Sequence, residues 1–198
     1  RMADRMQIGT GVKFALGENP KSVYNDRDET PITRMATAAM IREGLAKAQR
    51  YQQELDFAES DPDEHMPDYD AKSEALLPLL ERDVKAHFHC HRADDICTAI
   101  RIAKEFNLDY VIIHGTEGHL ISDILAEENA PVIAGPILCD RCKPEMQNLT
   151  ISGPSIMQKA GVKLALCTDH PVIPIQYLPT TAALAVKGGM QREDALYA

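Results

Sequence analysis

Metal-competent side chains end three short apolar segments between residues 84 and 169. They are His87, His89, His91, His114 and Asp169. Imidazoles and carboxylates are ligands for a borderline divalent ion such as zinc, and an open position on that ion would hold an activated water. A lone histidine at such a position is more often a hydrogen-bonded structural residue. The recurrence at successive segment ends favours a metal site suited to hydrolysis, in which an aspartate could serve as general base.

The elements that must position these side chains alternate regularly. We expect strands at 84–89, 110–114, 132–135 and 163–168, separated by helices at 93–106, 119–128 and 154–160. Short apolar strands joined by crossover helices are typical of a parallel sheet. In a parallel β/α barrel the carboxyl ends of the strands face one mouth, so these side chains would converge there.

The first part of the chain supplies one more strand and a long helix. A strand at 11–16 is expected to break at a turn or loop over 17–20, just where Glu18 stands. A helix is expected over 33–59, with a buried stripe made of Met40, Ile41, Leu45, Ala48 and Leu55.

Three further segments follow from composition. The acidic, proline-bearing stretch 61–68 is expected to be a solvated loop, and a helix at 71–82 is expected to kink or split at Pro78. The segment 177–187 is apolar and alanine-rich, and 192–197 is expected to begin one more helical turn, which indicates a truncated chain.

Length and composition exclude several classes of protein. The 198 residues can form one domain but fall short of the roughly 250 typical of a closed eight-fold barrel. A formal charge of −9 disfavours nucleic acid and anionic membranes as partners and leaves a small-molecule substrate as the expected partner. No apolar run long enough to span a membrane and no apolar signal core at residues 1–6 is present, and the five cysteines suit reduced thiols, which together favour a cytoplasmic location.

Four separated segments resemble imidazolonepropionase-type members of the amidohydrolase superfamily. They are 15–21 (ALGENPK), 89–96 (HCHRADDI), 114–119 (HGTEGH) and 168–171 (TDHP). The resemblance runs over nearly the whole chain, in order. It implies an α/β fold of the parallel β/α barrel (TIM-barrel) type, incomplete here: residues 1–198 would form a single domain with barrel strands four to eight, without the first strands and the flanking β-sandwich.

The resemblance also implies a metal site. His89 would be the ligand from the fifth barrel strand, His114 the ligand from the sixth, and Asp169 the ligand and base from the eighth. The family's fourth-strand ligand would be Glu18, with a carboxylated Lys13 as the alternative.

The register at the fifth strand stays open, because His87 points to the same side as His89 and His91 and only one of the three need bind metal. On the substrate side of the site we expect His91, Arg92, His119 and His170.

The implied reaction is hydrolysis of an amide or cyclic amide C–N bond with one or two divalent ions, for which zinc is the expected metal. Two other hypotheses are a sugar deacetylase or deaminase on the same scaffold, and a non-catalytic domain whose histidines are structural or bind metal without turnover.

The family's first-strand His-x-His pair is missing, so we expect this chain alone to be inactive. Open sheet edges would favour a homo-oligomer. The Cys139-x-x-Cys142 spacing lacks a second pair, so no thiolate metal site is expected.

Overall fold

The protein is built on one sheet of five parallel strands. The computed structural model describes residues 11–61, 63 and 65–198, so residues 1–10, where a signal core would lie, are outside the described part. The strands are β1 (Gly11–Ala15), β2 (Lys85–Cys90), β3 (Tyr110–His114), β4 (Val132–Ala134) and β5 (Leu164–Leu166). They pair in sequence order, and all four pairings are parallel. The parallel α/β order is therefore confirmed; within the described residues β1 and β5 do not pair with each other, and the sheet is not closed into a barrel.

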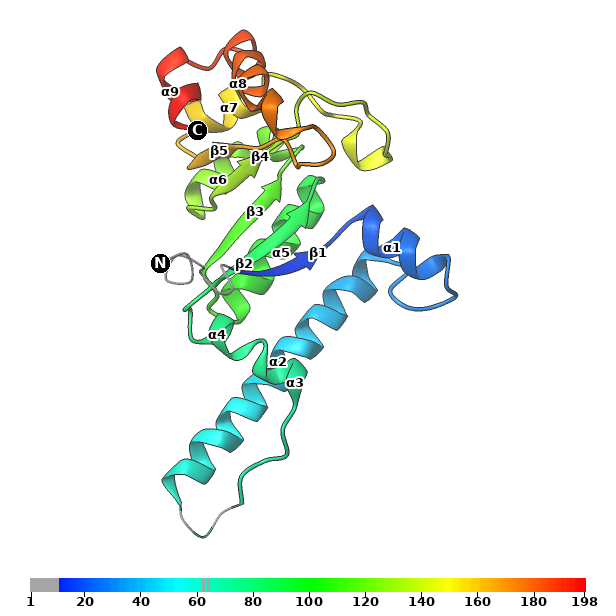
Figure 1. Ribbon diagram of the computed structural model, residues 1–198, viewed down its shortest axis with the longest axis vertical. Helices are drawn as coiled ribbons and strands as arrows, with labels where there is room; N and C mark the ends of the chain where they lie inside the picture. Colours follow the sequence, from blue (N-terminus) through cyan, green and yellow to red (C-terminus); the bar gives the residue numbers. More distant parts are fainter. Residues whose placement is uncertain (1–10, 62, 64) are drawn as a thin grey trace.

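Helices connect the strands and pack against the sheet (Figure 1). They are α5 (Ala93–Glu105), the 3-10 turn η2 (Gly118–Leu120), α6 (Ser122–Glu127), η3 (Pro144–Met146), α7 (Gly153–Lys159), η4 (Ile175–Tyr177), α8 (Leu178–Lys187) and α9 (Arg192–Tyr197). The expected helix at 119–128 is divided into η2 and α6 around Ile121. No helix in the described part of the chain has both the length and the apolar character needed to cross a bilayer.

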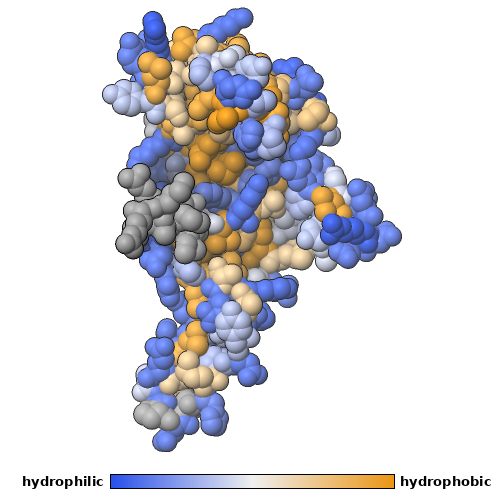
Figure 2. Space-filling view, viewed as in Figure 1, coloured by the Kyte–Doolittle hydropathy of each residue, from blue (hydrophilic) through white to orange (hydrophobic). Residues whose placement is uncertain are grey.

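Strand alternation separates a core face from a polar face. Phe88 and Ile112 are fully buried on adjacent strands and belong to the same core as Ile96 of α5. One residue along, Lys13 and His87 are paired on the opposite face, where Lys13 is exposed. The outer helices therefore cover the face that carries Phe88 and Ile112, while the other face carries Lys13, His87 and His89 beside the apolar Val111 and Ile113. Figure 2 shows apolar residues reaching the surface in the middle of the molecule, among hydrophilic residues.

The chain after β1 is helical where the sequence predicted a turn. Helix α1 (Glu18–Asn25) begins directly after Gly17, so the prediction for residues 17–20 was wrong. Gly17 has φ 85°, which turns the chain out of β1 at little steric cost. Pro20 lies in the first turn of α1, where the missing N–H removes no helical hydrogen bond.

The long helix α2 (Arg34–Ser60) begins where it was predicted. The Oγ1 of Thr33 caps it by accepting the Ala36 N–H at 3.1 Å. Leu45 and Ala48 are buried as expected, but Met40 is 43% exposed, so its place in the buried stripe was wrong. The far half of α2 extends beyond the sheet as an arm (Figure 1), where it has little core to cover.

Two short helices lead back from the arm to β2. They are α3 (Ala71–Glu74) and α4 (Leu77–Leu80), and the predicted interruption near Pro78 is confirmed. Pro78 lies in the first turn of α4, the position that tolerates its missing N–H. The stretch at 65–70 carries no regular structure, as expected, whereas residues 62 and 64 lie outside the described part.

Candidate metal centre

Three buried histidines meet at the carboxyl end of β2 and β3. One ring nitrogen each from His89, His91 and His114 lies within 4.8 Å of the other two. The rings of His91 and His114 are stacked with centroids 4.7 Å apart, and the His89 ring stands edge-on to His114 at 4.5 Å. Parallel pairing of adjacent strands brings together side chains that are 25 residues apart in sequence. We call this group the histidine cluster.

The backbone around the cluster is constrained. His114 has φ 75° and Asp169, just after β5, has φ 53°, in the left-handed region that non-glycine residues rarely adopt. The Nδ1 of His114 lies 2.6 Å from the carbonyl oxygen of Gly135, so Nδ1–H donates and Nε2 faces the cluster. Gly135 has φ 134°, and an added Cβ there would overlap the Cys167 carbonyl. A glycine is thus required to bring the acceptor of His114 into place.

A chain of hydrogen bonds sets the tautomer of His89. Lys143 donates to Oδ1 of Asn19, which turns the Asn19 amide nitrogen toward Nε2 of His89 at 3.2 Å. His89 therefore accepts at Nε2 and carries its proton on Nδ1, which donates to Nε2 of His114 over 2.9 Å. The Nδ1 of His91 is bonded to Oγ1 of Thr116 at 2.7 Å.

Burial keeps these imidazoles neutral. Burial, followed by the neighbouring His114, lowers the pKa of His89 to about 3, and the same causes lower the pKa of His91 to about 2. Burial also lowers the pKa of His114, although its bond to Gly135 and the Asp169 carboxylate act in the opposite direction. Neutral imidazole is the form that binds metal ions, so the donor set fits a borderline divalent cation.

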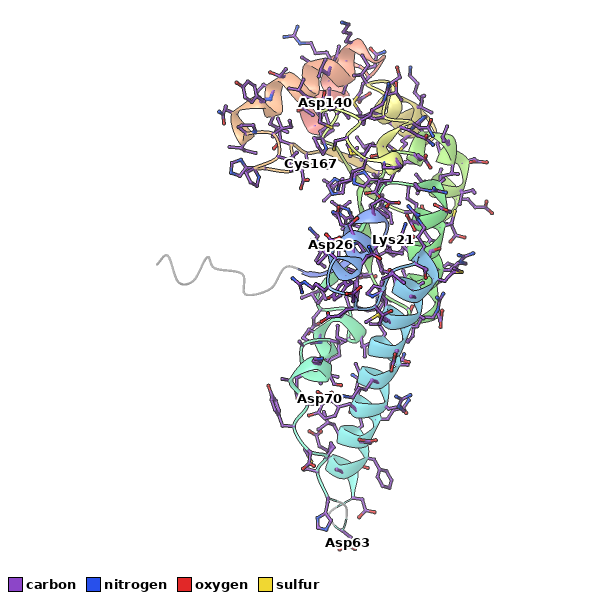
Figure 3. All side chains as sticks on the ribbon, turned by 90° about the vertical axis from the view of Figure 1, so that its right-hand side faces the viewer. Lys21, Asp26, Asp63, Asp70, Asp140 and Cys167 are labelled. Carbon is purple, nitrogen blue, oxygen red and sulfur yellow. The ribbon has the colours of Figure 1, made fainter. Side chains whose placement is uncertain are left out.

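A cavity of about 740 Å³ opens beside the cluster. Its polar lining includes Asn19, His89, His91, Asp140, Lys143 and Asp169. Leu138, Met146, Val172 and Ile173 contribute apolar walls, and Cys139 and Cys142 also border it. Figure 3 views the molecule from the side where the strands end and shows Asp140, after β4, above Lys21 of α1. The cavity therefore lies between the start of α1 and the loops that follow β4 and β5.

The structure brings some of the predicted metal ligands together and not others. His89 and His114 lie in the cluster, and Asp169 lines the cavity beside it. The carboxylate of Glu18 instead pairs with Arg34 at 2.9 Å and with Lys21 at 3.4 Å. Burial raises the pKa of Glu18, but these two cations outweigh it and lower the pKa overall. Its role as a ligand stays a prediction.

Lys13 on β1 and His87 on β2 are the alternative metal ligands that the sequence left open. Lys13 contributes to the lowered pKa of His89 and His114, so its ammonium lies within electrostatic reach of the cluster. His87 is paired with Lys13 and is half-buried. Among the described residues, the cluster takes in His89 and His91 but not His87.

The predicted substrate-side residues lie in different surroundings. His91 lines the cavity, whereas Arg92 forms a two-point contact with Asp94 at 3.0 and 2.8 Å. His119 bonds the Thr116 carbonyl oxygen at 3.0 Å. His170 is exposed next to Asp169. Of these four, the cavity lining drawn from the described residues includes His91 alone.

Sequence reasoning missed a buried network behind the cluster. Glu145 of η3 is fully buried, and its Oε2 accepts the Glu18 N–H at 2.7 Å. Arg34 donates to Asp95 at 3.0 Å and lies 4.0 Å from Glu145. Glu145 stands in a polar loop segment, where a glutamate is ordinarily solvated, so no pattern marked it.

A comparison with solved structures supports the amidohydrolase resemblance. The chain is similar to the crystal structure of an amidohydrolase from Thermotoga maritima MSB8, with 44% identity and a TM-score of 0.91. The match covers 94% of this chain and 49% of that one, so the chain spans about half the length of this relative. No protein-family model matches the chain, and a search of curated proteins found no match. An α/β fold and a buried histidine group at the strand ends are thus found in a chain that closely resembles part of an amidohydrolase.

Proposed function

We propose that this chain is part of a metal-dependent, imidazolonepropionase-like amidohydrolase that hydrolyses the C–N bond of an amide or cyclic amide. The observation that carries the proposal is the histidine cluster at the carboxyl end of a parallel sheet. The similarity to an amidohydrolase gives that cluster its chemical context. A small molecule that fits the adjoining cavity is the proposed substrate.

The residues divide the work as follows. His89, His114 and Asp169 would hold a divalent ion, of which zinc is the proposed one. Such an ion, when bound, supplies an activated water and polarises the substrate carbonyl. Asp169 would accept a proton from the attacking water as the C–O bond forms, and deliver it to the leaving nitrogen as the C–N bond breaks.

We further propose that β1 to β5 correspond to the fourth to eighth strands of a barrel. The open sheet and the coverage of about half the relative support this. The donors that further strands would add are absent from the described residues, so we expect this chain alone to turn over substrate slowly or not at all. Its open edges make pairing with a second copy a proposal as well.

The proposal is tested by incubating the purified chain with zinc and three substrate panels: cyclic amides, N-acetylated sugars and amino-substituted heterocycles. The Asp169→Asn variant is the control. Hydrolysis of cyclic amides that is lost in the variant supports the proposed reaction and contradicts the expected inactivity of the chain. Acetate or ammonia release favours the deacetylase or deaminase alternative, and bound zinc without turnover is the result expected of an incomplete site. Turnover that is unchanged in Asp169→Asn contradicts the role given to Asp169.

A further inference from the structure

Glu145 carries an unpartnered buried oxygen. Its Oε2 accepts the Glu18 N–H, but Oε1 is buried without a hydrogen-bond partner among the described residues. A buried carboxylate oxygen that lacks a donor costs free energy, so a donor is expected to face it. The groups around Oε1 therefore indicate which side chain could be its donor.

Two donors lie near this oxygen. The Nε2 of His91 is 3.8 Å away and the Nζ of Lys143 is 3.9 Å away. Lys143 already donates to Asn19, and its side chain is 35% exposed, so it can also be hydrated. The His91 ring is buried, with Nδ1 held by Thr116, and its Nε2 points toward Glu145.

We propose that Glu145 is a positioning residue of the histidine cluster: its Oε1 accepts the Nε2–H of His91, while the Thr116 hydroxyl donates to Nδ1 of the same ring. His91 is then fixed at both nitrogens and supports His114 by stacking on it at 4.7 Å. This reading of the cluster rests on the proposed function, whose divalent ion would be held by His89, His114 and Asp169. His91 is a positioning residue as well, and not a ligand.

The alternative tautomer is electrostatically unfavourable. A buried neutral imidazole has one N–H. If that proton sat on Nδ1, the Nε2 lone pair would face the carboxylate oxygen of Glu145 with no proton between them. At 3.8 Å the two atoms are beyond hydrogen-bond length, and an approach of about 1 Å closes the bond.

The geometry also argues against Glu145 as a ligand. Its carboxylate is not in the group whose ligand atoms all lie within 4.8 Å of one another. It is held by the Glu18 N–H instead, and Gly17 makes this possible because an added Cβ there would overlap Oε2.

The test is the tautomer of His91 in the metal-free chain, read from long-range ¹H–¹⁵N correlations of the histidine rings. His91→Gln identifies the His91 signal by its loss. We expect the Nε2–H form in the wild type and the Nδ1–H form in Glu145→Gln, whose amide NH₂ would face Nε2. The matched control Thr116→Val is expected to keep Nε2–H.

An Nδ1–H ring in the wild type, or an unchanged tautomer in Glu145→Gln, would overturn the inference. If Glu145→Gln does not fold, the wild-type spectrum still tests the inference, because it shows which nitrogen of His91 carries the proton.

Zinc retention separates this inference from the proposed function. Zinc that is retained by the wild type and by His91→Gln supports both. Zinc that is absent from every form, with an Nε2–H ring, defeats the proposed function and leaves the positioning role standing. Zinc that a folded His91→Gln loses makes His91 a ligand and overturns the inference.

Discussion

Arg34 holds two buried or partly buried carboxylates behind the cluster, and its removal should destabilise the fold. Its Nε donates to Asp95, whose side chain is 3% exposed, and its Nη2 donates to Glu18 at 2.9 Å. Arg34→Met keeps most of the side-chain volume but leaves Asp95 buried without its cation. Removing one partner of a buried pair costs about 3–5 kcal/mol. Because the Arg34 side chain is 24% exposed, we take the lower end, about 3 kcal/mol.

The assay is urea unfolding at two pH values. Burial raises the pKa of Asp95 even though Arg34 opposes the shift, and without Arg34 that pKa rises further. A carboxyl group whose pKa is raised by folding binds protons that the unfolded chain releases, so its contribution to stability falls as pH rises above its ordinary value. Arg34→Met should therefore lose more stability at pH 7 than at pH 5, and its melting temperature near neutrality should fall by roughly 6–12 °C.

Arg42→Met is the matched control on the same helix. Its partner Glu105 is 46% exposed, so the loss should stay below about 1 kcal/mol and show no added pH dependence. Equal losses in the two variants, or an Arg34→Met loss that is independent of pH, would refute the reasoning.

Four other substitutions test the local structure by chemical denaturation. Gly17→Ala combines φ 85° with a clash against Glu145 and should cost more than 2 kcal/mol or so, whereas Gly161→Ala, at φ 94° with open space around it, should cost about 1 kcal/mol. Equal costs would show that the contact with Glu145 is unimportant. Thr33→Ala removes the cap of α2 and should cost about 1 kcal/mol, and an unchanged unfolding midpoint would contradict the cap. Leu45→Ala empties a fully buried site and should cost about 2–5 kcal/mol, and a loss below 1 kcal/mol would mean that α2 packs loosely on the core.

The sequence predicted the sheet better than the connections around it. Apolar runs bounded by turn residues identify buried parallel strands, so β2 to β5 were found to within about two residues at each end. Helix α1 was missed because Gly17 and Pro20 favour a turn locally, and only the tertiary contact from Glu145 caps its first N–H. Met40 was misplaced because periodicity shows which residues share a helix face but not where the sheet beneath that face ends.

The candidate site was predicted in part for a similar reason. Strand ends can be located from local patterns, so His89, His91 and His114 were among the side chains expected to converge, although His87 was grouped with them and lies outside the cluster. Glu145 meets Glu18 across 127 residues, and no local pattern encodes such a contact. The tautomers likewise depend on partners such as Gly135, just after β4, which are distant from the histidines in sequence.

The central claim is that the histidine cluster binds a divalent metal ion. Elemental analysis of the purified chain, after exposure to zinc and gentle desalting, tests it most directly. We expect about one zinc per chain in the wild type and in His65→Ala, whose histidine is exposed far out on the arm, with loss of zinc in His114→Ala and Asp169→Ala. A wild-type chain that retains no zinc, or a folded His114→Ala variant that retains as much as the wild type, would contradict the account.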